Sequence, residues 1–283
     1  MKNKLTVASV AFVFLIGLCV LLYPMASDLI SRWTSNVSIR SYVQQVAEMD
    51  DIERQSQLAE ARAYNQALAN GQTGGYALDS GLGGGAQSAF ETSWMERVEM
   101  LREGAMIGYL KIPKINVYLP IRHGTSAEVL EEGVGHLDNT SLPVGGLATH
   151  AALSGHTGLP TSHLLTDLDQ LEVGDVFYVY VLGETLAYQV DQIKVVEPTE
   201  TEDLAVVPGE DDMTLVTCTP YGINSHRLLV RGRRTAYTET AEETQQRLSA
   251  RKEALLIPGY VFSAIAGLLY VLGACVARMR RRG

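Results

Sequence analysis

Cysteine is scarce in this chain, with three residues in a sequence of 283. Cys19 and Cys275 lie in long apolar runs near the two ends, where a thiol behaves as a small hydrophobic side chain. Cys218 is the one cysteine between those runs, so it has no partner there for a disulfide. A lone thiol of this kind is either a reactive group or an inert one, and its surroundings decide which.

Signals of cofactor binding are also missing. The chain has no zinc-ligand spacing, phosphate-binding loop or dinucleotide fingerprint, so we predict no metal and no other cofactor. The formal net charge of −9, with basic residues clustered at the termini, argues against a nucleic-acid partner. The acidic groups at 200–203 and 210–212 lack EF-hand spacing, and we interpret them as solvated turns.

A long apolar run is present at each end of the chain. Leu5–Tyr23 follows Lys2 and Lys4 and approaches the ~20 residues that a membrane-spanning helix needs. No small-residue cleavage site follows it, which favours an anchor over a cleaved signal peptide. Leu255–Ala277 precedes an arginine-rich tail, which favours the cytoplasmic side. We therefore expect a two-pass protein of the lipid bilayer, at the cell membrane, with both termini cytoplasmic and the part between the runs extracellular.

The part between the runs changes in character near residue 105. Before this point, residues 41–69 and 88–103 are predicted to be helices, and the glycine-rich segment 71–85 is a flexible linker or a lid. After it, short apolar runs alternate with Gly, Pro and Asp, which predicts a mainly β fold of six to eight strands, a small barrel or a sandwich. The strands are expected at Met106–Ile112, 116–121, 148–154, 176–182, 186–196, 213–217 and 227–231, with helical turns near 126–132 and 162–168.

These features divide the chain into six parts. The β-rich part is long enough for one hydrophobic core, and it is expected to carry the chemistry. The parts are a transmembrane anchor (1–24), a helical region with a glycine-rich lid or linker (25–104), a β-rich catalytic domain (105–235), a linker (236–254), a transmembrane helix (255–277) and a basic tail (278–283).

The stretch Thr214–Arg233 reads as strand, loop and strand. Cys218 falls at the end of the first strand and Arg227 at the start of the second, and adjacent antiparallel strands would bring them together. A cysteine nucleophile needs a group that manages its proton, and a cation or donors that meet the oxyanion. Cys218 and Arg227 are thus candidates for these roles, although a surface ion pair is the alternative for Arg227. The hydroxyl of Thr217 is a candidate for orienting the substrate.

Six histidines could serve as the proton carrier. His156 lies between two glycines directly after the apolar run 148–154, at a strand end like that of Cys218. His226 adjoins Arg227, but alternation along a strand would point the two side chains to opposite faces. The remaining histidines (His123, His136, His150 and His163) lie in or beside loops without a comparable setting, so His156 is the candidate.

The segment TLVTC, followed by a short loop and Arg227, resembles the TLxTC…R signature of the sortases, the membrane-anchored cysteine transpeptidases of Gram-positive surfaces. The segments 108–126, 131–146, 154–175 and 217–232, together with the C-terminal apolar run, are similar to the class C, pilin-polymerising branch. The resemblance implies an eight-stranded β-barrel and a catalytic triad of His156, Cys218 and Arg227.

The N-terminal region departs from this resemblance. Class C sortases commonly carry a lid with an Asp-Pro-aromatic motif, whereas the corresponding segment here reads Leu78-Asp79-Ser80-Gly81. Asp79 is the candidate remnant of the motif, and Tyr76, Phe90 or Trp94 are candidates for the aromatic plug.

The resemblance implies cleavage of an LPxTG-type sorting signal between Thr and Gly, through a thioacyl-enzyme, in pilin or surface-protein substrates. The expected acceptor is a pilin lysine amine, as in pilus assembly. The alternatives are a housekeeping sortase that uses cell-wall peptide, a cysteine hydrolase that uses water, and a non-enzymatic surface scaffold with an inert thiol.

Overall fold

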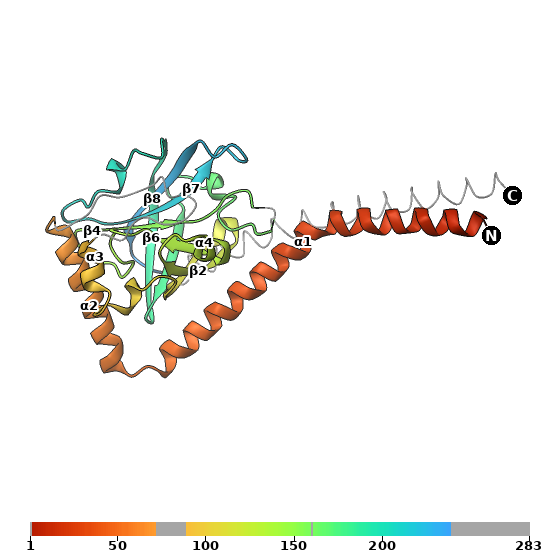
Figure 1. The fold of residues 1–283 in the computed structure, drawn as a ribbon. Helices are drawn as coiled ribbons and strands as arrows, with labels where there is room; N and C mark the ends of the chain where they lie inside the picture. Colours follow the sequence, from red (N-terminus) through yellow and green to blue (C-terminus); the bar gives the residue numbers. More distant parts are fainter. Residues whose placement is uncertain (1, 72–88, 160, 239–283) are drawn as a thin grey trace. The chain divides into compact units, whose positions relative to one another are not determined.

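The structure is a computed structural model that describes residues 2–71, 89–159 and 161–238, with backbone alone at 2–13, 15 and 89. The lid candidates Tyr76 and Asp79, the predicted C-terminal span and its basic tail lie outside the described residues. Residues up to Tyr237 form one compact unit, shown in Figure 1. Its α-helices are α1 (Lys2–Glu48), α2 (Asp51–Ala69), α3 (Ala89–Trp94) and α4 (Ala127–Glu132).

Eight strands of the described residues close into a barrel in the order β1-β2-β3-β4-β7-β8-β6-β5. The β2–β3 and β4–β7 pairs are parallel and the other pairs are antiparallel. This confirms the predicted mainly β fold and the barrel that the resemblance implied. The strands are β1 (Met106–Ile112), β2 (Val117–His123), β3 (Val134–His136), β4 (Thr149–Ser154), β5 (Val176–Val181), β6 (Glu184–Val196), β7 (Asp211–Thr219) and β8 (His226–Thr235).

Strand β7 is covered on both faces. Leu215 belongs to the main hydrophobic core, whereas its neighbour Val216 joins a second cluster that includes Leu204 and Leu229. Successive side chains of a strand point to opposite faces, so both sides of this strand are shielded from water. A strand buried on both faces reads as a continuous apolar run, as Met213–Val216 does apart from Thr214. The strand that leads to Cys218 is therefore rigidly placed.

Polar contacts attach the N-terminal helices to the barrel. The hydroxyl of Tyr42 on α1 donates to the carbonyl of Ile107 at 2.7 Å and accepts from the amide of Leu182 at 2.8 Å. The side-chain amide of Asn65 on α2 exchanges two hydrogen bonds with the backbone of Leu142, at 3.0 and 2.7 Å. All four hydrogen bonds are buried, so losing either anchor would leave unsatisfied backbone groups.

The helices differ from their predicted limits. The expected helix 41–69 is two helices, because α1 continues from the N-terminal run to Glu48 and α2 begins at Asp51. Asp50 caps α2, since its carboxylate accepts from the amide of Glu53 at 2.7 Å. The helix expected over 88–103 is wrong in length: α3 ends at Trp94, and only a 3₁₀ turn at Glu99–Leu101 follows. Further 3₁₀ turns occupy Pro113–Ile115, Leu168–Gln170 and Glu202–Leu204.

Within the part of the chain that the structure describes, no helix combines the length and the apolar character needed to cross a membrane.

Candidate active site

Cys218 and Arg227 are direct neighbours across the β7–β8 pair. Their Cα atoms are register partners in the antiparallel ladder, and opposite residues of such a pair project to the same face. Cys218 is a partly exposed free thiol near the end of β7. Arg227 is 8% exposed. The structure thus brings together the thiol and the guanidinium that the sequence predicted as partners.

Two hydrogen bonds hold the guanidinium of Arg227. Its Nη1 donates to the carbonyl of Asn224 at 3.2 Å and to the carbonyl of His226 at 3.1 Å. Both acceptors belong to the chain entering β8, so the loop between the two strands orients the guanidinium. An arginine held in this way presents fixed donors and a permanent charge beside the thiol.

His156 lies on the other side of Cys218. Strand β4 runs parallel to β7 with Ser154 opposite Val216, and the amide of Gly155 continues the pairing with a 3.0 Å bond to the carbonyl of Val216. His156 follows two residues after the end of β4. In the order β4–β7–β8, the strand of Cys218 therefore lies between the strand that leads to His156 and the strand of Arg227.

Gly155 is required where the chain leaves β4. A Cβ at this position would lie 2.7 Å from Cδ1 of Leu165, which is fully buried, and 3.1 Å from Cγ1 of Val134. Glycine lets the backbone pass close to this packed side chain and brings the next residue, His156, toward the end of β7.

The hydroxyl of Thr217, a candidate for orienting the substrate, has a partner within the protein. Its side chain is 4% exposed, and its hydroxyl donates to the carbonyl of Gly155 at 2.7 Å. This bond ties β7 to the segment before His156. A contact between Thr217 and substrate stays a prediction.

Burial sets the charge state of His156. Desolvation lowers the pKa of its half-buried imidazole, and the nearby carboxylate of Glu131 opposes this by favouring the charged form. The lowered pKa favours the neutral imidazole at pH 7. Glu131 lies 25 residues earlier in the chain, on helix α4, so no local sequence pattern indicated its influence on this site.

The loop between β7 and β8 lies beside the segment that follows His156. Tyr221 is 69% exposed, and a Cβ on Gly158 would lie 3.0 Å from its ring. The aromatic side chain from one loop thus covers the backbone just beyond His156. Sequence reasoning did not single out Tyr221, because an exposed aromatic residue in a loop carries no distinctive spacing.

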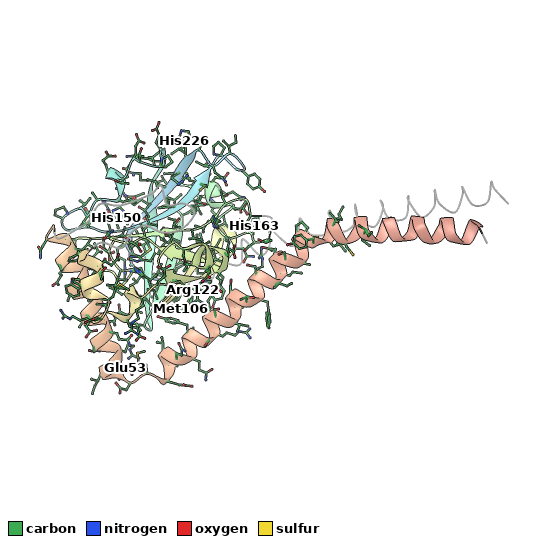
Figure 2. The ribbon with its side chains drawn as sticks, viewed as in Figure 1. Glu53, Met106, Arg122, His150, His163 and His226 are labelled. Carbon is green, nitrogen blue, oxygen red and sulfur yellow. The ribbon has the colours of Figure 1, made fainter. Side chains whose placement is uncertain are left out.

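The other histidines have separate partners. His150 contacts the hydroxyl of Thr214 at 2.8 Å, His163 pairs with Asp167 at 2.7 Å, and His226 contacts the hydroxyl of Ser225 at 2.8 Å. Figure 2 shows His150, His163 and His226 at well-separated positions. His123 and His136 are buried against each other. His156 is the histidine that directly follows β4, at the end of that strand that pairs with β7 near Cys218.

Phe90 and Trp94, on α3, are partly buried and pack against Tyr64 of α2. The ring of Tyr64 stacks on Phe90 with centroids 5.6 Å apart and meets Trp94 edge-on at 5.9 Å. Both side chains also pack against the main hydrophobic core. These contacts give no support to the prediction that either residue plugs the site.

A thiol opposite a guanidinium in a β-barrel, next to a strand that leads to a histidine, is an arrangement suited to a cysteine acyl-transfer enzyme. A family model described as a sortase domain matches residues 110–235. Sortase D of Bacillus subtilis strain 168 is 31% identical over 134 residues, which cover 46% of this chain and 65% of that protein. The chain spans 40–65% of the lengths of the curated relatives it matches, less than two thirds in each case.

Solved structures match over more of the chain. Sortase C1 of GBS pilus island 1 is 45% identical with a TM-score of 0.64, and the match covers 72% of this chain and 94% of that one. Sortase C of Clostridium perfringens, solved with the C-terminal cell wall sorting motif, is 42% identical with a TM-score of 0.61, covering 71% and 99%. The chain therefore belongs to the sortase family of cysteine transpeptidases. Within that family it belongs to the class C sortases.

Proposed function

We propose that this protein cleaves an LPxTG-type sorting signal between Thr and Gly and joins the threonine carbonyl to a lysine amine of a pilin. The observation that carries the proposal is the register of Cys218 opposite Arg227 on β7 and β8, with β4, the strand that leads to His156, paired to the other side of β7. Each of these side chains has one role in a two-step acyl transfer.

The first step forms a thioester on Cys218. Its sulfur, as thiolate, attacks the threonine carbonyl carbon, and the C–N bond to glycine breaks when the tetrahedral intermediate collapses. His156, in its protonated form, gives its proton to the departing glycine amine. In the second step a lysine amine attacks the thioester, the neutral imidazole takes a proton from it, and the C–S bond breaks. The thiolate and the imidazolium that began the cycle are thereby restored, and transfer of the proton between them returns the thiol and the neutral imidazole.

Arg227 supports both tetrahedral intermediates. Its guanidinium stays charged at any physiological pH and is held by the carbonyls of Asn224 and His226. A fixed cation near the attacked carbonyl stabilises the developing oxyanion without reorganising during the reaction.

The similarity to class C sortases supports a pilin lysine as the acceptor. One similar structure is named for a pilus island and another was solved with a cell wall sorting motif. These names describe those proteins, and their 42–45% identity to this chain supports the same substrate class here.

We also propose that the enzyme is anchored in the cell membrane with its barrel outside the cytoplasm. The run Leu5–Tyr23 supports this, as does the exposure of Val20, Leu21 and Tyr23 on α1, which are 58–70% exposed. Apolar side chains so exposed are favourable in lipid and unfavourable in water. Retention of the chain in the membrane fraction after alkaline extraction is expected, and its release would contradict the anchor.

The test is mass spectrometry of the products formed by the full chain in detergent. It is incubated with an LPxTG peptide and, separately, with a pilin domain, a cell-wall peptide or no acceptor. Peptide linked to a pilin lysine through an isopeptide bond is the expected product. Linkage to the cell-wall peptide alone would indicate a housekeeping sortase, and free threonine acid in every arm would indicate a hydrolase.

A further inference from the structure

A buried cluster of His123, Glu91 and Asp138 lies apart from the residues of the proposed reaction. His123 ends β2, Glu91 belongs to α3, and Asp138 follows β3. Nε2 of His123 is 3.8 Å from Oε1 of Glu91 and 3.7 Å from Oδ1 of Asp138. One ligand atom from each residue lies within 4.8 Å of the other two. His123 and Glu91 are fully buried.

The hydrogen bonds of His136 fix the tautomer of His123. Nε2 of His136 is 2.9 Å from the carbonyl of Ser141, and a carbonyl only accepts, so this nitrogen carries the proton. The other nitrogen, Nδ1 of His136, is then the acceptor in its 3.0 Å contact with Nδ1 of His123. His123 therefore donates from Nδ1, and its Nε2 carries a bare lone pair.

This lone pair points at two carboxyl groups. Among the residues that the structure describes, neither Nε2 of His123 nor Oδ1 of Asp138 has a hydrogen-bond partner, although both atoms are buried. Lone pairs that converge without a proton between them repel one another, and each has lost its contact with water. A cation placed among them would satisfy all of these atoms at once.

The surrounding charge favours a cation. Glu91 and Asp138 each bring a carboxyl group within 4 Å of Nε2 of His123. The carboxylate of Glu103 lies beside Gly124, the residue after His123, since a Cβ on Gly124 would overlap it. Three acidic side chains thus surround one neutral imidazole, and each would gain from a positive charge.

We propose that His123, Glu91 and Asp138 bind a divalent transition-metal ion, Zn²⁺ or Mn²⁺. An imidazole nitrogen with carboxylate oxygens is a donor set that suits these ions. Ligands about 2.0–2.2 Å from a tetrahedral zinc ion lie roughly 3.3–3.6 Å from one another, so the 3.7 and 3.8 Å separations need to close only slightly. The bond from His123 to His136 is the outer hydrogen bond that orients most metal-binding histidines.

The ion would join three parts of the fold that are distant in sequence. It would fasten α3, which directly follows the glycine-rich segment, to the end of β2 and to the chain after β3. Its role is structural, because its ligands are not among the residues proposed to carry acyl transfer.

The test measures metal bound to the full chain in detergent. All variants carry Cys218→Ala, so that the catalytic thiol contributes no binding. Protein stripped with a chelator is dialysed separately against Zn²⁺, Mn²⁺, Ca²⁺ or Mg²⁺, and the bound ion is counted by plasma mass spectrometry. We expect close to one Zn²⁺ or Mn²⁺ per chain, together with a rise in melting temperature.

Two variants and one control locate the ion. His123→Asn keeps a donor toward His136 but removes Nε2, and Asp138→Asn keeps the shape of the carboxylate; each is expected to weaken binding at least tenfold. Circular dichroism verifies that both variants fold. His163→Gln changes an exposed histidine that pairs with Asp167 and is expected to leave binding unchanged. No bound Zn²⁺ or Mn²⁺, binding of Ca²⁺ or Mg²⁺ alone, or full binding in both folded variants would overturn the proposal.

Discussion

Cys218 on β7 and Arg227 on β8 face each other as register partners in the barrel wall. Antiparallel register fixes this pairing through the hydrogen bonds of both strands, so the distance between the thiol and the guanidinium does not depend on flexible side chains alone. The loop that joins the two strands also orients the guanidinium through the carbonyls of Asn224 and His226. The thiol and its fixed cation are therefore built into one hairpin.

Replacing Arg227 by lysine tests whether the shape of the cation matters. Arg227→Lys keeps the charge but loses the planar set of donors, and we expect kcat/KM for an LPxTG peptide to fall about 10²- to 10³-fold. Arg233→Lys is the matched control, since Arg233 lies on the same strand but pairs with Glu210 and Asp212. Equal activity in wild type and Arg227→Lys would rule out this role for the guanidinium.

Thr217→Val tests the bond that ties β7 to the segment before His156. The change keeps the shape but leaves the carbonyl of Gly155 without its 2.7 Å hydrogen bond, which should cost about 1–3 kcal/mol of stability. We also expect kcat to fall while KM changes little, because the imidazole shifts and the substrate contacts remain. Thr217→Ser restores the hydroxyl and should recover both quantities. If Thr217→Val matches Thr217→Ser in thermal melting and in kcat, the bond has no positioning role.

Glu131→Gln should move the pKa of His156 downward. The carboxylate of Glu131 favours the imidazolium, so removing its charge leaves burial to lower the pKa further. Nuclear magnetic resonance titration of the His156 ring measures this, and the acidic limb of the kcat/KM profile that His156 governs should move to lower pH. Glu132→Gln is the control, because Glu132 pairs with Arg122 at 3.0 Å. An upward or absent shift in Glu131→Gln would contradict the account.

The buried His150 should make the fold less stable in acid. Desolvation lowers its pKa, against the opposing charges of Asp212 and Asp191, while Arg231 adds to the lowering. Below its unfolded pKa of about 6.5 the unfolded chain binds a proton that the folded chain does not, so stability falls as pH drops. In urea unfolding, the free energy of unfolding should fall less between pH 7 and pH 5 in His150→Gln than in the wild type, by at most about 2 kcal/mol. An unchanged loss would mean that His150 is not neutral in the fold.

The parts of the fold that the sequence predicted are those with local signals. Seven of the eight strands are apolar runs bounded by Gly, Pro or Asp, and all seven were expected near their observed places. Strand β3 was missed because Val134–His136 is three residues long and contains a glycine. It is a strand only because β2 and β4 pair with it on either side.

The helix boundaries show what propensity alone omits. The break between α1 and α2 had a signal, because Asp50 and Glu53 have the spacing of a capping box. The composition of 88–103 predicted one continuous helix. Val98, Met100 and Leu101 instead pack in the main hydrophobic core, outside any α-helix. Tertiary packing decided this segment.

The residues proposed to react carry local signals in the sequence, whereas the buried cluster does not. Cys218 and Arg227 lie one short loop apart, and His156 stands out between two glycines at a strand end. Glu91, His123 and Asp138 come from three separated segments without metal-ligand spacing, so only the closed barrel brings them together. The prediction of no metal followed from spacing, which cannot detect such a site.

The most direct test of the central claim is intact-protein mass spectrometry of the full chain mixed with an LPxTG peptide in the absence of an acceptor. We predict a mass increase equal to the peptide up to its threonine. Peptide mapping should place it on Cys218, rather than on Cys19 or Cys275, and hydroxylamine should remove it. No adduct, or an adduct on any other residue, would contradict the assignment of Cys218 as the acyl carrier between His156 and Arg227.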